Sequence, residues 1–208
     1  MDAAHWDEAY GRLGASGVSW FRDHAEPSLA LLSQVGDQVG SVIDVGGGAS
    51  PLAAALLDRG IPDVAVLDIS PTALDAARAA LGGRAEQVQW ITADLRTWQP
   101  GRTWDLWHDR AVFHFMVTDA ERDAYRRALA SAIAPGGHVI AATFAPDGPE
   151  QCSRLPVHRY GADELVDALG DDFLLLDERR EVHVTPSGAE QPFTWVLARR
   201  APGPGRRP

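Results

Sequence analysis

The residues whose types and spacing could do chemistry begin with the segment VIDVGGGAS, which starts at Val42. An apolar run carries one acid, and a cluster of small residues follows it. The members of this predicted loop site are Asp44, Gly46, Gly47, Gly48 and Ser50. Glycines let the main chain approach a ligand closely, and the N–H groups at the start of a following helix point toward that ligand. The segment therefore predicts a loop that binds a nucleotide or a nucleoside.

Two loop templates compete for this segment. The dinucleotide fingerprint G-x-G-x-x-G needs a third glycine for close helix–strand packing, and Pro51 occupies that place. The other template, acid-x-G-x-G-x-small, is filled completely. Structural explanations stay open beside ligand binding: Asp44 as a buried acid that pins the loop through N–H bonds, and Gly47 as a turn residue with positive φ.

Two more carboxylates follow the next two apolar runs. Asp68 ends VAVLD, 20 residues past Gly48, and Asp94 follows WITA. A carboxylate at the end of the second strand can accept hydrogen bonds from both ribose hydroxyls, which every nucleoside ligand offers. Both residues have the alternative of being ordinary strand-end acids. The neighbours expected on the same ligand surface are Ile69, Ala93 and Leu95.

The order and spacing of these motifs resemble the Rossmann-like class I methyltransferases, which bind S-adenosylmethionine. The glycine loop is similar to their first motif, and APGGHVIAATF, beginning at Ala134, is similar to the Pro-Gly-Gly entrance of their fifth strand. The resemblance spans roughly residues 40–200. It implies S-adenosylmethionine as the cofactor, with Asp68 on the ribose and Asp94 on the adenine amino group.

The segment ahead of the first predicted strand is Gly-punctuated and unusually aromatic. We expect it to be a flap that folds over the cofactor, similar to the Trp…Trp flap of the thiopurine, thiol and halide methyltransferases. Its candidate cofactor-binding residues are Trp6, Tyr10 and Trp20. Packing among helices is the alternative for these rings.

Candidate catalytic residues follow the fourth apolar run, in HDRAVFHF. The pair Asp109-Arg110 resembles the Asp-Arg-Gly of the thiopurine, thiol and halide branch, with Ala111 in place of the glycine. Arg110 is expected either to hold an anionic substrate group through its forked donors or to form with Asp109 a structural pair that ties strand four to the flap. His114 is expected to be either a general base or a core histidine.

The predicted substrate site extends into the segment 144–160, where that branch carries a substrate loop. The candidate substrate-binding residues are Arg110, His114, Phe144, His158 and Tyr160. A solvated loop is the alternative for His158 and Tyr160.

Five apolar runs must position these residues. They predict strands at 41–45, 64–69, 88–93, 105–110 and 138–145. Helical patterns separate them at 50–59, 71–81 and 119–133, and Ser70 before Pro71 forms a favourable N-cap. Apolar strands that alternate with helices predict a parallel sheet covered on both faces.

The pattern changes after residue 160. A helix at 162–169 precedes two long runs, 173–184 and 191–200, which predict an antiparallel hairpin at one edge. The fold class is therefore α/β: a doubly wound, Rossmann-like, seven-stranded, mostly parallel sheet with an antiparallel last strand. We expect one domain over 1–200. Its parts are a flap at 1–38 and a core at 40–200, and the Pro/Gly/Arg-rich tail 201–208 is expected to be disordered.

Composition narrows the partners. The net charge of −10 argues against a nucleic-acid substrate, because proteins that bind the phosphate backbone are usually basic. One cysteine, Cys152, and no metal-ligand spacing among seven histidines predict no metal. The chain has no 18-residue apolar run and an acidic, polar N-terminus, so we expect no membrane span and a cytoplasmic location.

Together these observations predict an S-adenosylmethionine-dependent methyltransferase, monomeric or homodimeric, that acts on a small-molecule S, O or N nucleophile, which we expect to be thiol-like. Methyl transfer is an in-line displacement, so the enzyme mainly aligns the nucleophile and excludes water. Protein lysine methylation, a dinucleotide-dependent oxidoreductase and a non-catalytic nucleoside-binding module remain as alternatives.

Overall fold

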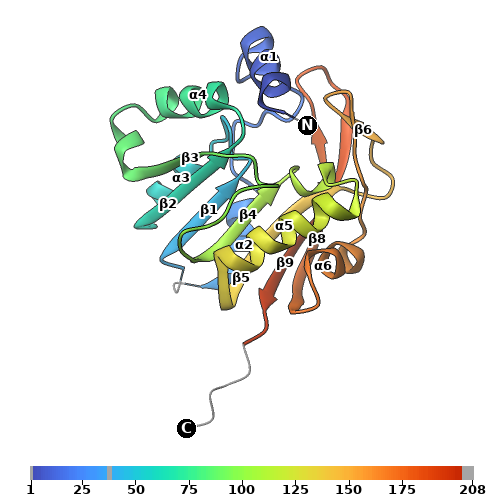
Figure 1. Ribbon diagram of the computed structural model, residues 1–208. Coiled ribbons are helices and arrows are strands. Elements are labelled where there is room, and N and C mark those ends of the chain that lie inside the picture. Colours follow the sequence, from blue (N-terminus) through green and yellow to red (C-terminus); the bar gives the residue numbers. More distant parts are fainter. Residues whose placement is uncertain (1, 37–38, 203–208) are drawn as a thin grey trace.

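The computed structural model describes residues 2–36 and 39–202, and its centre is one seven-stranded sheet in the order β3-β2-β1-β4-β5-β9-β8 (Figure 1). The strands are β1 (Ser41–Val45), β2 (Asp63–Asp68), β3 (Val88–Thr92), β4 (Trp104–Arg110), β5 (Ile133–Phe144), β8 (Phe173–Val184) and β9 (Glu190–Arg200). β9, the last strand in the chain, runs antiparallel to both of its neighbours, β5 and β8. The predicted fold class is confirmed. The predicted tail lies outside the described residues from position 203 onward.

Helices cover both faces of the sheet, because successive strand residues point to opposite sides. The helices are α1 (Ala3–Leu13), α2 (Ser28–Val35), α3 (Leu52–Asp58), α4 (Pro71–Leu81), α5 (Asp119–Ala132) and α6 (Ala162–Leu169), with 3₁₀ turns η1 (Gly82–Gln87) and η2 (Phe113–Phe115). On one face Val42, Val66 and Leu106 pack against α2, α3 and α4. On the other face Ile43 and Trp107 pack against α5 and α6.

The starts of the two long crossover helices are fixed by their first residues. Ser70 accepts a hydrogen bond from the N–H of Ala73 at 3.1 Å, which confirms the predicted N-cap of α4. Thr118 and Glu121 form a capping box at the start of α5. Both helices therefore begin just after the carboxyl end of a strand, where loops that bind ligands lie in open α/β sheets.

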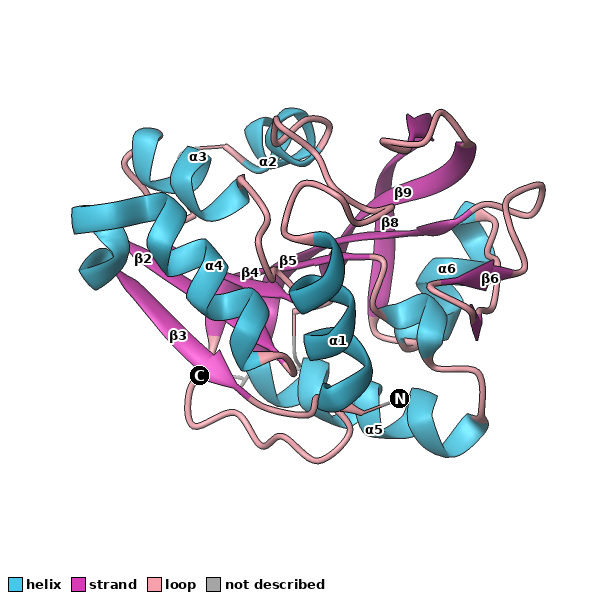
Figure 2. Ribbon diagram, turned by 90° about the horizontal axis from the view of Figure 1, so that it is seen from above, coloured by secondary structure: helices cyan, strands magenta, loops and turns pink. Residues whose placement is uncertain are grey.

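The N-terminal segment crosses this carboxyl edge, and α1 lies between α4 and the small β6 hairpin (Figure 2). Asp7 of α1 accepts a hydrogen bond of 2.6 Å from the Ser70 hydroxyl, and His5 lies 3.1 Å from the hydroxyl of Ser153. The hairpin, β6 (Gln151–Cys152) with β7 (Leu155–Pro156), was not expected in a segment that the sequence presents as a loop. Helix α1 and the β6–β7 hairpin therefore both cover the carboxyl edge of the sheet.

Among the described residues, no helix combines the length and the apolar character that crossing a membrane would need.

Candidate functional site

Two adjoining cavities open along the carboxyl edge of β1, β2 and β4. The first cavity, about 740 Å³ including solvent at its mouth, lies between the ends of β2 and β4 and the flap. The second, about 600 Å³, lies over the glycine loop. Tyr10, Trp20, Gly46 and Arg110 line both cavities.

Most of the predicted cofactor residues lie on these walls. The first cavity includes Trp6, Tyr10, Trp20, Gly46, Asp68, Ile69, Ala93, Asp94 and Leu95. The second includes Asp44, Gly46, Gly47 and Ser50. Gly48 lines neither cavity. A Cβ at Gly48 would lie 2.7 Å from the Tyr10 hydroxyl and 3.1 Å from Asp68 Oδ2, so its lack of a side chain lets the flap approach the loop.

The glycine loop is held from β2. The N–H groups of Gly46 and Gly47 both donate to the carbonyl of Leu67, at 2.6 and 3.3 Å. Positive φ occurs at Gly46 (65°) and Gly48 (42°) and not at Gly47, so the expectation of positive φ at Gly47 is wrong. Gly47 is required for space instead, because a Cβ there would lie 2.5 Å from Asp44 Oδ2.

Asp44 forms part of a buried chain of side chains beneath this loop. Its Oδ1 lies 2.7 Å from His108 Nδ1, and His108 Nε2 lies 2.8 Å from the Ser28 hydroxyl. The pairing follows from the parallel register of β1 and β4, which places Asp44 beside His108. The expected pinning through loop N–H groups is not among the hydrogen bonds of the described residues. Asp44 Oδ2 is buried without a partner, so one acceptor remains free.

Asp68 and Asp94 are both bonded by their own chain. Asp68 Oδ1 accepts from the Ser70 N–H at 2.8 Å, and burial raises the pKa of this carboxyl to about 6. Asp94 is gripped by Arg96, whose Nη2 lies 2.7 Å from Oδ2 and whose Nε lies 3.0 Å from Oδ1. Hydrogen bonds from the Arg96 side chain lower the pKa of Asp94, so it stays ionised at neutral pH.

Asp109 faces away from the cavities, because it shares a side of β4 with Trp107. Its Oδ1 accepts from the Val112 N–H at 2.9 Å, and its Oδ2 accepts from the Phe113 N–H at 3.1 Å and the Tyr125 hydroxyl at 2.7 Å. Burial raises the pKa of Asp109 to about 6. Both oxygens are occupied and neither cavity includes this residue. Asp109 therefore holds the turn after β4 and is a positioning residue, not a catalytic one.

Arg110, one residue further, points to the other side and lines both cavities. Its Nη1 donates to the carbonyl of Trp20 at 3.0 Å, so the predicted tie between strand four and the flap exists, through Arg110 alone. Nε and Nη2 are buried without a partner. The next residue, Ala111, has φ of 72°, a left-handed conformation in which glycine is favoured.

The flap aromatics form a connected cover. Trp20 Nε1 donates to the Tyr10 hydroxyl at 3.0 Å, and the Trp6 ring lies edge-on to Trp20 and Phe115, with centroids 5.3 Å apart in each pair. Desolvation raises the pKa of Tyr10 to about 12, so its hydroxyl stays protonated. These rings pack against one another and also line the first cavity, and their contact with a cofactor stays a prediction.

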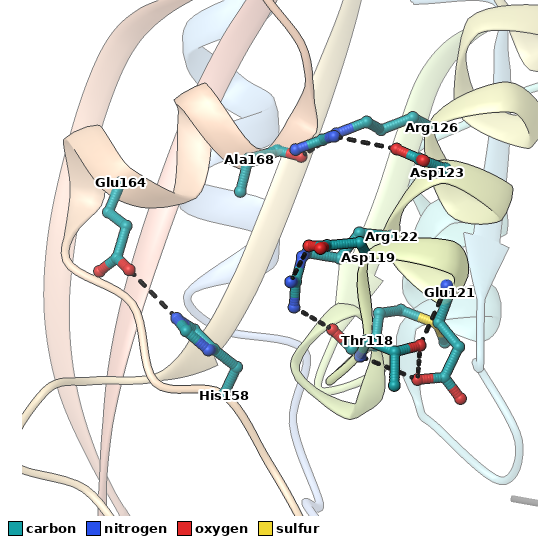
Figure 3. A network of polar contacts seen from close by, with 10 residues as sticks. Thr118, Asp119, Glu121, Arg122, Asp123, Arg126, His158, Glu164 and Ala168 are labelled. Carbon is teal, nitrogen blue, oxygen red and sulfur yellow. Dashed lines mark hydrogen bonds and ion pairs between the residues drawn. The ribbon is translucent and has the colours of Figure 1, made fainter.

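The other predicted substrate residues line neither of the two cavities. His114 is fully buried, and desolvation with the nearby Arg110 charge lowers its pKa to about 3, which makes it a poor base. Phe144 and Tyr160 lie in the core. His158 is exposed and turns toward Glu164 of α6, 3.1 Å away, beside the ion pairs of α5 (Figure 3). The structure favours the core alternative for His114 and the surface alternative for His158.

Several wall residues escaped sequence reasoning. They include Val112, Phe115, Met116 and Cys152 in the first cavity, and Arg22, Ser28 and His108 in the second. Phe115 and Met116 directly follow HDRAVFH, so the turn after β4 was a usable signal. Ser28 and His108 are 80 residues apart and carry no motif. Among the described residues, no cluster of three or more His, Cys, Asp or Glu side chains is arranged to hold a metal ion.

Comparison with known proteins finds a family match in the central part of the chain. Residues 42–137 match the family model described as a methyltransferase domain. The chain is 32% identical over 140 residues to a trans-aconitate 2-methyltransferase of Rhizobium leguminosarum bv. trifolii, which covers 66% of this chain and 51% of that protein. It spans about half the length of the curated relatives it matches.

Solved structures show the same fold over nearly the whole chain. A structure described for the conversion of a disulfide bond into a thioacetal group during echinomycin biosynthesis has a TM-score of 0.77 at 22% identity, covering 97% of this chain and 94% of that one. The 1,6-didemethyltoxoflavin-N1-methyltransferase of Burkholderia thailandensis, with S-adenosylhomocysteine bound, has a TM-score of 0.68 at 19% identity, covering 96% and 84%. The central part of this chain therefore matches a methyltransferase-domain model, and nearly the whole chain shares the Rossmann-like fold of these solved structures.

Proposed function

We propose that this protein is an S-adenosylmethionine-dependent methyltransferase whose acceptor is a small molecule. The observation that carries the proposal is the meeting of three features in two adjoining cavities: the glycine loop, the carboxylates at the ends of β2 and β3, and the aromatic flap above them. The family match over residues 42–137 covers the first two features. The flap is contributed by the preceding segment.

The residues present fit this cofactor. Asp68 lies where a carboxylate accepts the ribose hydroxyls, and Asp94, ionised and oriented by Arg96, offers acceptor oxygens to the adenine amino group. The unpartnered buried Asp44 Oδ2 is a free acceptor in the second cavity and suits the ammonium of the amino-acid end. When bound, S-adenosylmethionine supplies an electrophilic methyl group on a sulfonium sulfur, which is transferred by in-line displacement.

In such a transfer the protein aligns the nucleophile with the methyl group and excludes water. Trp6, Tyr10 and Trp20 cover the first cavity, and Phe115 and Met116 complete an apolar wall beside it. A dry, shaped site aligns a nucleophile with the methyl carbon and keeps water from competing. Because His114 is buried and its pKa lies near 3, the proposal includes no general base from this residue.

The acceptor atom, S, O or N, belongs to the proposal and not to the comparisons. Two of the compared proteins are named for acting on small molecules, an organic acid and a nitrogen heterocycle. The resemblance to the thiopurine, thiol and halide branch rests on Asp109-Arg110. The structure separates those two side chains onto opposite sides of β4, which weakens them as a joint catalytic pair.

The proposal is tested in two steps. Calorimetry is expected to show binding of S-adenosylhomocysteine and none of NAD; the reverse result would return the site to the dinucleotide alternative. Release of S-adenosylhomocysteine from S-adenosylmethionine is then followed with carboxylic acids, thiols, phenols, amines, halides and histone-like peptides as acceptors. Turnover with a peptide alone would favour protein methylation. Binding without turnover on any acceptor would favour the non-catalytic module.

A further inference from the structure

The guanidinium of Arg110 is tethered by one edge only. Nη1 donates to the Trp20 carbonyl, which fixes the plane of the group. Nε and Nη2 lie on the other edge, and their N–H bonds run parallel, as the bidentate recognition of a carboxylate requires. Both atoms are buried and have no hydrogen-bond partner. The fork is therefore already held in place and has nothing bound to it from the described chain.

Among the described residues, no acid forms a hydrogen bond with this fork. Glu181, the acid beside the flap, is taken by Arg22 and by Trp195 Nε1, the latter at 2.8 Å. Asp109 faces the other side of β4. Asp44 gives its Oδ1 to His108, and its Oδ2 has no hydrogen-bond partner, so Asp44 acts on Arg110 through its charge but does not bond to the fork. The remaining contact is the ring of Phe193, 4.9 Å from Arg110 Cζ.

The lowered pKa of Arg110 shows that its charge is unfavourable in these surroundings. Burial, and then the nearby charge of Arg22, lower its pKa from 12.5 to about 9. A buried cation without an anionic partner is unfavourable and is usually compensated by pairing. A sulfonium cofactor in the same cavity adds further positive charge. A ligand that brings a carboxylate would relieve both.

The elements around the fork point to the acceptor. Trp20, Phe193 and Cys152 contact or face Arg110, and all three lie outside residues 42–137, the part that matches the methyltransferase-domain model. The cofactor loops of β1, β2 and β3 lie inside that part. Arg110 thus lies where the part that matches the domain model meets the segments outside that match, and it borders the first cavity as well as the second.

We infer that the Nε–Nη2 fork of Arg110 anchors a carboxylate of the methyl acceptor, which makes the acceptor class a small carboxylate-bearing molecule. The inference rests on the proposed function. A bidentate pair engages both oxygens of the carboxylate, so this group is the handle and the methylated S, O or N atom lies elsewhere on the molecule. The amino-acid end of the cofactor carries the same chemistry, so the experiment has to separate the two sources.

The first arm of the experiment compares small carboxylates with their amides. In protein saturated with S-adenosylhomocysteine and at one ionic strength, succinate and benzoate are expected to raise the melting temperature, whereas succinamide and benzamide are not. Arg110→Met and Arg110→Lys should abolish the carboxylate shift, since neither retains the fork. The matched control is Arg126→Met, an arginine of α5 bonded to Ala168 and Asp123 outside both cavities. Equal shifts from acids and amides, or a shift that survives in both Arg110 variants, would overturn the inference.

The second arm uses cofactor affinity. If the fork binds the carboxylate of the acceptor, the Kd for S-adenosylhomocysteine in Arg110→Met stays within about threefold of wild type. A rise of about 30-fold or more, the usual loss for a severed buried charge pair, with unchanged binding of methylthioadenosine, would assign the fork to the cofactor and refute the acceptor anchor. Failure of wild type to bind S-adenosylhomocysteine at all would refute the proposed function instead.

The third arm guards against a folding artefact. Arg110→Met removes an unpaired buried charge, so the ligand-free variant is expected to melt no lower than wild type. If it fails to fold, Arg110→Lys keeps the charge without the fork and decides the question by its carboxylate shift. For any acceptor found by screening, KM is expected to rise at least about 30-fold in the Arg110 variants. For the amide of that acceptor, KM is expected to be the same in wild type and in the variants.

Discussion

The two halves of the carboxyl edge treat their polar groups in opposite ways. On the β2–β3 side, Asp68 is bonded to Ser70 and Asp94 to Arg96, so the side chains that would meet the nucleoside are held by their own chain. On the β4 side, the Nε–Nη2 fork of Arg110 is buried without a hydrogen-bond partner. Buried polar groups in native proteins are nearly always paired, so the exceptions need an explanation.

The difference teaches where each half gets its specificity. Pre-bonded carboxylates present fixed acceptors, and a site that serves one ligand gains from such preorganisation. Unpartnered groups are unfavourable until a ligand arrives, so they discriminate strongly against ligands that fail to pair them. Under the proposed function, the β2–β3 side serves the cofactor and the Arg110 fork serves the acceptor.

The largest expected effect concerns Asp109, which holds the turn after β4. Asp109→Ala leaves the N–H groups of Val112 and Phe113 and the Tyr125 hydroxyl without their buried acceptor. The free energy of unfolding is expected to fall by about 3 kcal/mol, since each unpaired buried donor costs about 1–3 kcal/mol. Urea unfolding measures this. Tyr125→Phe removes one of these bonds and is expected to cost about 1 kcal/mol. A normally stable Asp109→Ala protein that lacks turnover would restore a catalytic role.

Next in size is the cofactor half. Asp68→Ala removes the acceptor proposed for both ribose hydroxyls and is expected to weaken S-adenosylhomocysteine binding about 100-fold, as the loss of hydrogen bonds to a charged group predicts. Calorimetry measures the Kd. Asp75→Ala is the control, because Asp75 is an exposed acid of α4 paired only with Arg78. An Asp68→Ala affinity within twofold of wild type would remove the ribose assignment.

The comparison also explains which parts of the site were predictable from sequence. The glycine loop, Asp68 and Asp94 follow strands that the apolar runs mark within one or two residues, so spacing alone located them. The side of β4 to which Asp109 and Arg110 point depends on strand alternation and register. The pairing of Asp44 with His108 requires the β1–β4 register, which joins residues 64 positions apart.

Other features carry no sequence signal because they are short or tertiary. The β6 and β7 strands have two residues each, too few for a periodic pattern. His114 and Tyr160 look like site residues in sequence, but packing against Phe144 and Phe113 places them in the core. An unpartnered donor such as Arg110 Nη2 is a property of the surroundings, and only the folded structure reveals it.

A smaller effect should appear with pH. The pKa of Asp68 is about 6 in the free protein, raised mainly by burial. Ribose hydroxyls donate to the ionised carboxylate, so below pH 6 a proton must leave before the ligand binds. The Kd for S-adenosylhomocysteine is therefore expected to rise about tenfold between pH 7 and pH 5, with about fivefold of that rise between pH 6 and pH 5, and to stay level above pH 7. Calorimetry of Asp68→Asn is the comparison, because its affinity should lack this slope. A slope of equal size in both proteins would assign it to another group.

The smallest expected effect tests whether backbone strain follows the same division. On the cofactor half the left-handed positions are glycines, Gly46 and Gly48, whereas on the acceptor half the position with φ of 72° is Ala111. A side chain in that region costs about 1 kcal/mol, and the extra freedom of glycine in the unfolded chain offsets part of the gain. Ala111→Gly is therefore expected to raise the free energy of unfolding by about 0.5 kcal/mol.

Gly48→Ala is the mirror experiment, measured by the same urea titration. Its new Cβ would lie 2.7 Å from the Tyr10 hydroxyl and 3.1 Å from Asp68 Oδ2, so both stability and cofactor affinity are expected to fall. If Ala111→Gly instead lowers stability, the methyl group contributes more through packing against its apolar neighbours than the backbone conformation costs. If it raises stability and also raises the acceptor KM, the strain at Ala111 holds Arg110 in place. The alanine then belongs to the acceptor site as a rigid support directly beside the fork.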